Sequence, residues 1–197
     1  MRPTLTRSTQ ALACAAALLT LAACGGDADG EKTSASRSST SSEPTYDEKY
    51  AYSKARKIEP KQRAHDLNEP LPEDTEWATA RFINSFNKEI SAIKDAGAIQ
   101  KGQVKVTATY PAESDPDAPG GWDLTMYQCS TSTARLYKDG KDVTGTPGDP
   151  GTPLPKGPQK NVHLKSFTTP DHGKTWQLDK SKLLLGKDAR ESPCEGD

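Results

Sequence analysis

Three histidines and one neighbouring carboxylate are the residues of this chain whose types could perform acid–base chemistry. The histidines are His65, His163 and His172, and Asp66 directly follows the first of them. A histidine titrates near neutral pH and can therefore move a proton, which a carboxylate beside it can assist. Adjacent residues of a helix point in different directions, however, so His65 and Asp66 do not form a site by themselves. We expect no catalytic residue, and a protein that is not an enzyme.

Metal binding is the second chemistry that these residue types could support. Two histidines and an acid could hold zinc, but the chain has neither an HxxxH nor an HxH spacing. Glu113, Asp115 and Asp117 lie in one expected loop, 111–121, where carboxylates could bind calcium, although their spacing is not that of an EF-hand. Phosphate-binding, dinucleotide-binding and GxSxG patterns are also missing. We therefore expect a solvated loop, no metal ion and no cofactor.

The beginning of the chain has the composition of an export signal. Arg2 and Arg7 precede an apolar run, 11–21, which is too short to span a bilayer permanently. Cys24 directly follows Leu-Ala-Ala and resembles the cysteine of the bacterial lipobox, whose thiol receives a diacylglycerol and becomes the mature N-terminus. The alternative is an ordinary cleavage near Ala23 that leaves Cys24 free. We predict a signal peptide over 1–23 and lipidation of Cys24, with acyl chains such as palmitate holding the protein to the membrane.

Charge and location follow from that cleavage. Removing the first 23 residues takes away two arginines and no acid, so the formal net charge falls from −1 to −3. A mildly acidic chain lacks the basic face that binds nucleic acid. We expect an extracytoplasmic protein on the outer face of the cell membrane. Its partners are then the membrane itself, through the lipid on Cys24, and an unknown envelope protein or small ligand, with no nucleic acid.

Two further cysteines remain for the exported part of the chain. Cys14 leaves with the signal, which leaves Cys129 and Cys194. Disulfides persist in oxidising compartments outside the cytoplasm, so we predict a bridge between these two residues. The alternative is a pair of free thiols or a thiol catalyst, although neither residue belongs to a CxxC pair.

Elements that position these residues begin after a polar tether. Residues 24–44 carry no large apolar side chain and are predicted to be a disordered tether, which leaves 45–197 as a single domain. A first helical segment has apolar residues up to Ile58, and Pro60 should break or kink it. The strongest helical periodicity predicts an amphipathic helix over 76–96, capped by Asp74 or Thr75.

The second half of the chain alternates as strands do. Strands are expected at 103–110, 122–129, 135–137, 162–167 and 175–178. Asp139-Gly140 predicts a tight turn. The stretch 145–158 has nine Gly or Pro in fourteen residues and is expected to be irregular, and 182–197 to be a tail. Helices followed by strands favour an α+β fold in which N-terminal helices pack on a curved antiparallel sheet.

The stretch 169–176 resembles the Asp-box, Ser/Thr-x-Asp-x-Gly-x-Thr-Trp, which recurs once per blade in sialidase propellers. It occurs once here, in a chain too short for several blades. We interpret it as a structural hairpin turn. Asp171 would accept backbone hydrogen bonds, Gly173 would take an unusual φ, Thr175 completes the motif, and Trp176 would pack beneath.

The order of these features resembles a known family. Lipobox, polar leader, helices, the segments 127–129 and 138–141, a proline-rich stretch, a strand, Trp176 and Cys194 together are similar to secreted actinobacterial lipoproteins with an NTF2-like (SnoaL-like) cone fold. The resemblance implies helices closing a cone-shaped sheet, and a disulfide from a central strand to the C-terminus. It leaves two functions open. One is a non-catalytic, membrane-tethered binding or interaction module; the other is a cone-pocket small-ligand carrier or an enzyme using His65, Asp66 or a buried tyrosine.

Overall fold

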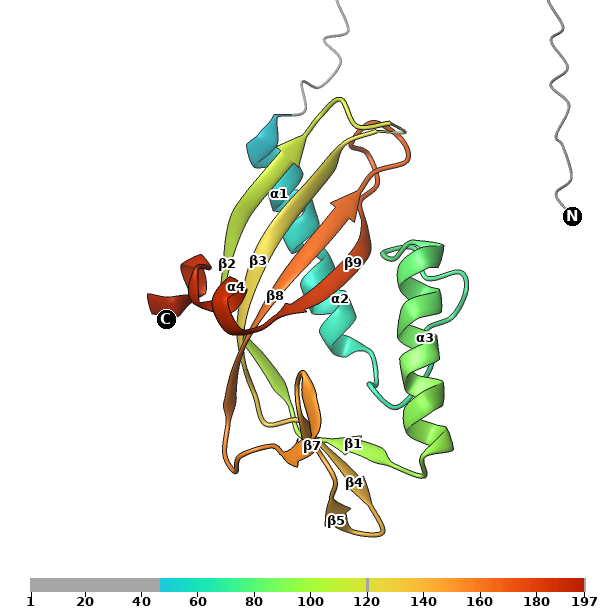
Figure 1. Ribbon diagram of the computed structural model, residues 1–197. Coiled ribbons are helices and arrows are strands. Elements are labelled where there is room, and N and C mark those ends of the chain that lie inside the picture. Colours follow the sequence, from blue (N-terminus) through green and yellow to red (C-terminus); the bar gives the residue numbers. More distant parts are fainter. Residues whose placement is uncertain (1–46, 120, 197) are drawn as a thin grey trace, which may run out of the picture. The chain divides into compact units, whose positions relative to one another are not determined.

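Four antiparallel strands form the central sheet of the protein (Figure 1). The computed structural model describes residues 47–119 and 121–196. In spatial order the strands are β2 (Val104–Asp115), β3 (Asp123–Ser132), β8 (Gln159–Thr168) and β9 (Gln177–Leu184). The expected loop over 111–121 is therefore wrong in its first half, because β2 continues to Asp115 and pairs there with Asp123. The predicted α+β class is confirmed.

Two consecutive helices, α1 (Glu48–Arg56) and α2 (Ile58–Ala64), lie along one face of this sheet (Figure 1). The carboxylate of Asp47 caps α1 by accepting a hydrogen bond of 2.7 Å from the backbone N–H of Tyr50. The break between the helices falls at Lys57, before the position expected from Pro60. Pro60 instead occupies the first turn of α2, where a missing backbone N–H leaves no helical bond unmade.

The third helix, α3 (Ala80–Asp95), is shorter than the predicted 76–96. Its N-cap is Thr79, whose hydroxyl accepts from the N–H of Phe82 at 3.2 Å, in place of Asp74 or Thr75. The preceding residues form a turn and a bridge to β9 in place of a helix: Leu178 donates its N–H to the Trp77 carbonyl at 2.9 Å, and Thr79 donates its N–H to the Leu178 carbonyl at 3.0 Å. Tertiary pairing thus overrides helical periodicity at this end.

A buried carboxylate on β9 holds the start of α3. Asp179 accepts hydrogen bonds of 2.9 Å from the Thr79 hydroxyl and from Nε of Arg81, and Arg81 adds a second bond through Nη2. This two-pronged contact is the geometry that makes an arginine–carboxylate pair specific. It sets the position of α3 beside the edge strand (Figure 1).

Two smaller sheets accompany the central one among the described residues. One contains β1 (Ile99–Lys101), β4 (Arg135–Lys138) and β5 (Lys141–Asp142); the other contains β6 (Gly145–Thr146) and β7 (Asp149–Pro153). The Asp139-Gly140 turn is confirmed, with φ of 52° and 75°. The stretch 145–158 is less irregular than expected, because it contains the β6–β7 hairpin. Nη2 of Arg135 holds its end by donating to the carbonyls of Pro155 and Gly157, both at 2.7 Å.

The hydrophobic core lies between the helices and the sheet. Its members come from α1, α2, α3, the sheet and the connecting segments: Ala51, Tyr52, Ala55, Ile58, Leu71, Ala78, Phe82, Ile83, Trp122, Leu124, Met126, Phe167, Trp176 and Leu178. Residues opposite one another in an antiparallel pair share a face of the sheet. Leu124 of β3 is opposite Phe167 of β8, and Met126 is opposite Lys165, so this face receives the helices and also carries one lysine.

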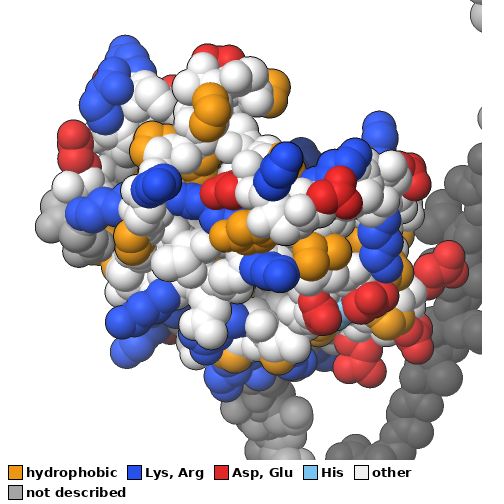
Figure 2. Space-filling view, turned by 90° about the horizontal axis from the view of Figure 1, so that it is seen from below, with side chains coloured by type: hydrophobic (Ala, Val, Ile, Leu, Met, Phe, Trp, Pro, Cys, Tyr) orange, Lys and Arg blue, Asp and Glu red, His pale blue; other side chains and the backbone are white. Residues whose placement is uncertain are grey.

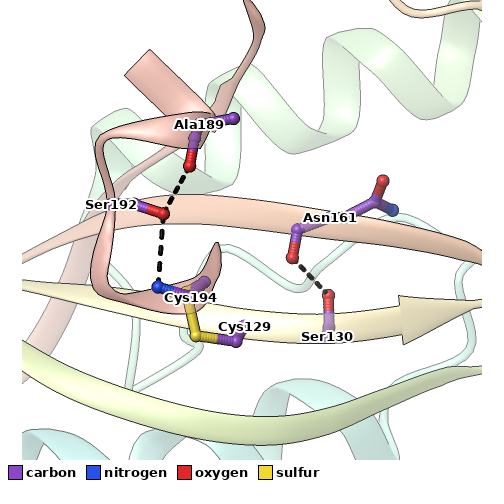
Figure 3. The surroundings of a disulfide bond; sticks show 6 residues. All are labelled: Cys129, Ser130, Asn161, Ala189, Ser192 and Cys194. Carbon is purple, nitrogen blue, oxygen red and sulfur yellow. Dashed lines mark hydrogen bonds between the residues drawn. A yellow bond between two sulfur atoms is a disulfide. The ribbon is translucent and has the colours of Figure 1, made fainter. Parts of the chain in front are cut away.

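The C-terminal segment is joined to the sheet by a disulfide (Figure 3). The expected tail over 182–197 is wrong in part: β9 runs to Leu184, and α4 (Gly186–Arg190) and the 3-10 helix Pro193–Gly196 follow. The disulfide links Cys194 to Cys129 of β3, with 5.5 Å between their Cα atoms. Ser192 supports this end by accepting from the N–H of Cys194 at 3.3 Å and donating to the carbonyl of Ala189 at 2.6 Å.

The predicted signal peptide, the lipidated Cys24 and the tether over 24–44 lie outside the described residues. Within the described part of the chain, no helix is both long enough and apolar enough to cross a membrane.

Candidate functional site

A cavity of about 600 Å³ opens between α2 and the face of the sheet that carries the core. Its lining comes from α2, the segment after it, β1 and all four strands of the central sheet: Glu59, Gln62, Arg63, His65, Asp66, Leu67, Asn68, Gln100, Gly102, Gln103, Val104, Val106, Gln128, His163, Lys165 and Ser181. Small-molecule sites have volumes of about 300–1,000 Å³. This cavity is therefore large enough for a small ligand, and its lining combines many polar groups with apolar surface.

Lys165 is the central side chain of this site. It stands on β8 opposite Met126, on the face that receives the helices, and is only 6% exposed. Its ammonium group donates a hydrogen bond to Oε1 of Gln62 on α2. Burial disfavours the charged form and lowers the pKa of Lys165 to about 8, although the nearby negative charge of Glu59 works in the opposite direction. The group is thus a buried cation at neutral pH.

His163 and Gln128 lie beside Lys165 on the same face. They stand opposite each other in the β3–β8 pair, one cross-strand position away from the lysine. Burial, followed by the positive charge of Lys165, lowers the pKa of His163 to about 4, so its imidazole is neutral at pH 7. Gln128 is 6% exposed, and its amide makes no hydrogen bond to any residue in the described ranges. It is therefore a polar group available to a ligand.

Glu59, Gln62 and Arg63 line the cavity from α2. Nε of Arg63 lies 3.7 Å from Oε1 of Glu59, one helical turn earlier, so the two charges partly neutralise each other. Asn68 joins the following segment to β1, because it accepts from the N–H of Gln100 at 2.7 Å and donates to the Gln100 carbonyl at 3.1 Å. These contacts give the cavity a fixed border.

His65 and Asp66, the candidate acid–base pair, line the cavity but bind other partners. Nε2 of His65 hydrogen-bonds the carbonyl of Glu69 at 2.8 Å, and the ring lies edge-on to Phe86. Oδ1 of Asp66 accepts from the backbone N–H of Asn68 at 2.9 Å and from its side-chain amide, and these bonds lower the pKa of Asp66. No hydrogen bond joins the imidazole of His65 to the carboxylate of Asp66. Both residues hold the turn after α2 in place.

The Asp-box residues form a hairpin turn outside the cavity. Oδ1 of Asp171 accepts from the N–H of Thr175 at 2.7 Å and from the hydroxyl of Thr169 at 2.9 Å. Gly173 has a φ of 93°. Trp176 is buried, donates its indole N–H to the Gly173 carbonyl at 3.1 Å and packs against Trp122. His172 also has a positive φ, of 55°, within the same turn.

Thr169 is the buried centre of this turn, and its hydroxyl gives a testable prediction. The side chain is 0% exposed and its oxygen accepts from the N–H of Gly173 at 2.8 Å. We expect Thr169→Val to lower the free energy of unfolding by about 1–3 kcal/mol, because valine keeps the shape but leaves a buried N–H without an acceptor. Urea unfolding measures this change.

Thr168→Val is the matched control for that substitution. Thr168 is the neighbouring residue and makes no side-chain hydrogen bond to the rest of the described chain, so its replacement should change the free energy of unfolding by no more than about 0.5 kcal/mol. Equal effects of the two substitutions would show that the Thr169 hydroxyl does not stabilise the turn.

The three acids that could bind calcium are spread along an edge. Glu113 and Asp115 belong to β2, and Oδ1 of Asp115 accepts from the N–H of Asp117 at 3.0 Å. Among the residues with a described position, no group of three or more His, Cys, Asp or Glu side chains is arranged to hold a metal ion. On the face shown in Figure 2, lysine and arginine side chains occur together with acidic ones, so neither sign of charge covers it alone.

Lys165, Gln62 and Gln128 were not among the sequence-predicted site residues. A signal for Lys165 exists, because it is two residues before Phe167 on a strand and must share its face. The alternation is ambiguous, however, since Val162 and Leu164 on the opposite face are also apolar. Gln62 and Gln128 are 66 positions apart in the sequence and line the same cavity only because of tertiary packing.

In comparisons with known families and with curated proteins, no family model and no curated protein matches this chain.

Proposed function

We propose that this chain is an extracytoplasmic lipoprotein, held to the outer face of the membrane by lipid on Cys24, whose folded part is a non-catalytic module that binds a small ligand. In this proposal the fold is NTF2-like, with α1 and α2 closing the curved sheet into a cone. The cavity of about 600 Å³ between α2 and the sheet carries the argument for a ligand. The lipobox-like residues before Cys24 carry the argument for the anchor.

Two contacts support binding in preference to acid–base catalysis. Nε2 of His65 is engaged by the Glu69 carbonyl, and Asp66 is engaged by Asn68. The amide of Gln128, by contrast, makes no hydrogen bond within the described chain, and Lys165 has donors left over after binding Gln62. Groups that can hold a ligand are thus available, while the candidate proton-transfer pair already has structural roles.

Native mass spectrometry of the full-length protein, extracted from its own membrane in detergent, tests both halves of the proposal. We expect a chain that begins at Cys24 with acyl chains attached, and a small-molecule adduct. Val106→Phe fills the wall of the cavity and should remove the adduct. Val143→Phe makes the same change at a 50% exposed residue away from the cavity and should retain it.

Three outcomes would count against the proposal. An unmodified Cys24 would contradict the proposed lipid anchor. An adduct retained equally by Val106→Phe would place the ligand elsewhere. A second protein bound in place of a small molecule would favour the interaction module.

A further inference from the structure

Lys165 faces the cavity with more hydrogen-bond donors than the protein uses. An ammonium group has three N–H donors. Within the described chain Lys165 makes one hydrogen bond, to the uncharged Oε1 of Gln62, although its side chain is only 6% exposed. A buried charge with so little compensation is costly, and a bound counter-ion relieves that cost.

The nearby carboxylates are not hydrogen-bonded to Lys165, although the negative charge of Glu59 partly offsets the charge of the lysine. Glu59 lies 3.7 Å from the guanidinium of Arg63, and Oδ1 of Asp66 accepts two hydrogen bonds from Asn68. Neither carboxylate hydrogen-bonds the ammonium group of Lys165. Among the described residues no carboxylate is hydrogen-bonded to this ammonium group, so that position is open to the carboxylate of a ligand.

We propose that the ligand of this cavity carries one carboxylate, held by the ammonium group of Lys165 and the side-chain amide of Gln128, and an uncharged, largely aliphatic body. This inference rests on the proposed function of the cavity. Lys165 and Gln128 are diagonal neighbours on adjacent strands and share one face of the sheet, so one carboxylate can reach both.

The rest of the lining limits the charge and shape of this ligand. Arg63 lies beside Glu59, which leaves Lys165 as the basic side chain of the described lining without an ion pair, so a second negative charge on the ligand would lack a partner. Leu67, Val104 and Val106 supply an apolar wall. An adjoining cavity of about 170 Å³ shares Lys165 and Gln128 and adds apolar side chains from Ile58, Met126 and Phe167.

Binding of a carboxylate should depend on pH through Lys165. Glu59 and Arg63 face the cavity from α2, His65 and Asp66 from the segment after it, and His163 from β8; the lining residues of β2, β3 and β9 have no titratable side chain. Burial lowers the pKa of Lys165 to about 8. Its charge is therefore complete below pH 7 and is lost as the pH rises above 8, and the affinity should fall about tenfold per pH unit there.

The test compares octanoate, octanamide, octylamine and octyl phosphate by isothermal titration calorimetry on the full-length protein in detergent. We expect octanoate to bind at least tenfold more tightly than each of the other three. Lys165→Met should abolish this preference and the pH dependence above 8 while leaving octanamide binding in place. Lys180→Met, the same change at an exposed lysine of β9, should retain both.

The outcomes separate the two proposals. Equal or tighter binding of octanamide, octylamine or octyl phosphate would overturn the carboxylate inference while supporting a ligand-binding cavity. Binding of none of the four would contradict both. A preference for octanoate that persists in Lys165→Met would place the carboxylate at another residue and overturn the inference.

Discussion

Replacing Cys129 and Cys194 together with alanine is expected to lower the free energy of unfolding by about 4 kcal/mol. The disulfide closes a loop across a sequence separation of 65 residues, and in the chain-entropy model a cross-link of this length restricts the unfolded chain by that amount. Both cysteines are buried, and the alanine side chains that replace them are also apolar, so the substitution adds no polar group to this environment. This loss is a large fraction of the 5–15 kcal/mol of total stability typical of a domain.

Urea unfolding followed by circular dichroism measures this loss. Reduction of the wild-type protein should reproduce it, and the same reductant should leave the double alanine variant unchanged, which controls for effects of the reagent. In the double alanine variant, hydrogen exchange should increase most at α4, because the disulfide is the cross-link that ties the C-terminal segment to β3. A loss below 1 kcal/mol would mean that packing of the C-terminal segment on the sheet holds it without the covalent link.

Lys165→Met is expected to raise the free energy of unfolding at pH 7 by about 2 kcal/mol. Burial lowers the pKa of Lys165 from 10.5 to about 8, and a difference of that size corresponds to about 3 kcal/mol. The loss of the hydrogen bond to Gln62 reduces this gain in the free energy of unfolding by about 1 kcal/mol. Methionine has a similar volume and fits beside Met126 and Phe167.

The sign of the pH dependence provides the control. The unfolded lysine holds its proton up to about pH 10.5 and the folded one up to about pH 8, so the burial cost is complete below pH 8 and disappears between pH 8 and 10.5. Wild-type stability should therefore rise relative to Lys165→Met across that window. Lys180→Met should follow the wild type. A less stable Lys165→Met, or parallel pH profiles, would show that Lys165 is not a buried cation.

Local patterns were sufficient to predict the fold class, most strands and the Asp139-Gly140 turn. They failed where pairing between distant segments decides the structure. Periodicity extended α3 back to residue 76, whereas Trp77 and Ala78 form a turn and a bridge that are held by Leu178, about 100 residues later. The density of Gly and Pro over 145–158 concealed the short β6–β7 hairpin. Arg135, which is distant in the sequence, holds the segment after that hairpin by binding the carbonyls of Pro155 and Gly157.

The cavity was beyond prediction for the same reason. It requires the register that sets Gln128 opposite His163 and Met126 opposite Lys165, and it requires α2 to lie over these pairs. The residues that sequence inspection selected by type, His65 and Asp66, do line the cavity. Their local hydrogen bonds, which depend on the shape of the turn after α2, give them structural roles that residue type alone does not reveal.

Both faces of strand β3 carry side chains with specific contacts, and this limits the insertions and deletions that the strand can tolerate. Gln128 lies on the cavity side, and Cys129, the next residue, joins the C-terminal segment on the other. Loss or gain of one codon just before this pair would turn both side chains to the wrong face. Descendants of this gene should therefore vary β3 by substitution and confine length changes to connections such as 145–158. An alignment of relatives should show this as a block without gaps around a cysteine that follows a polar residue.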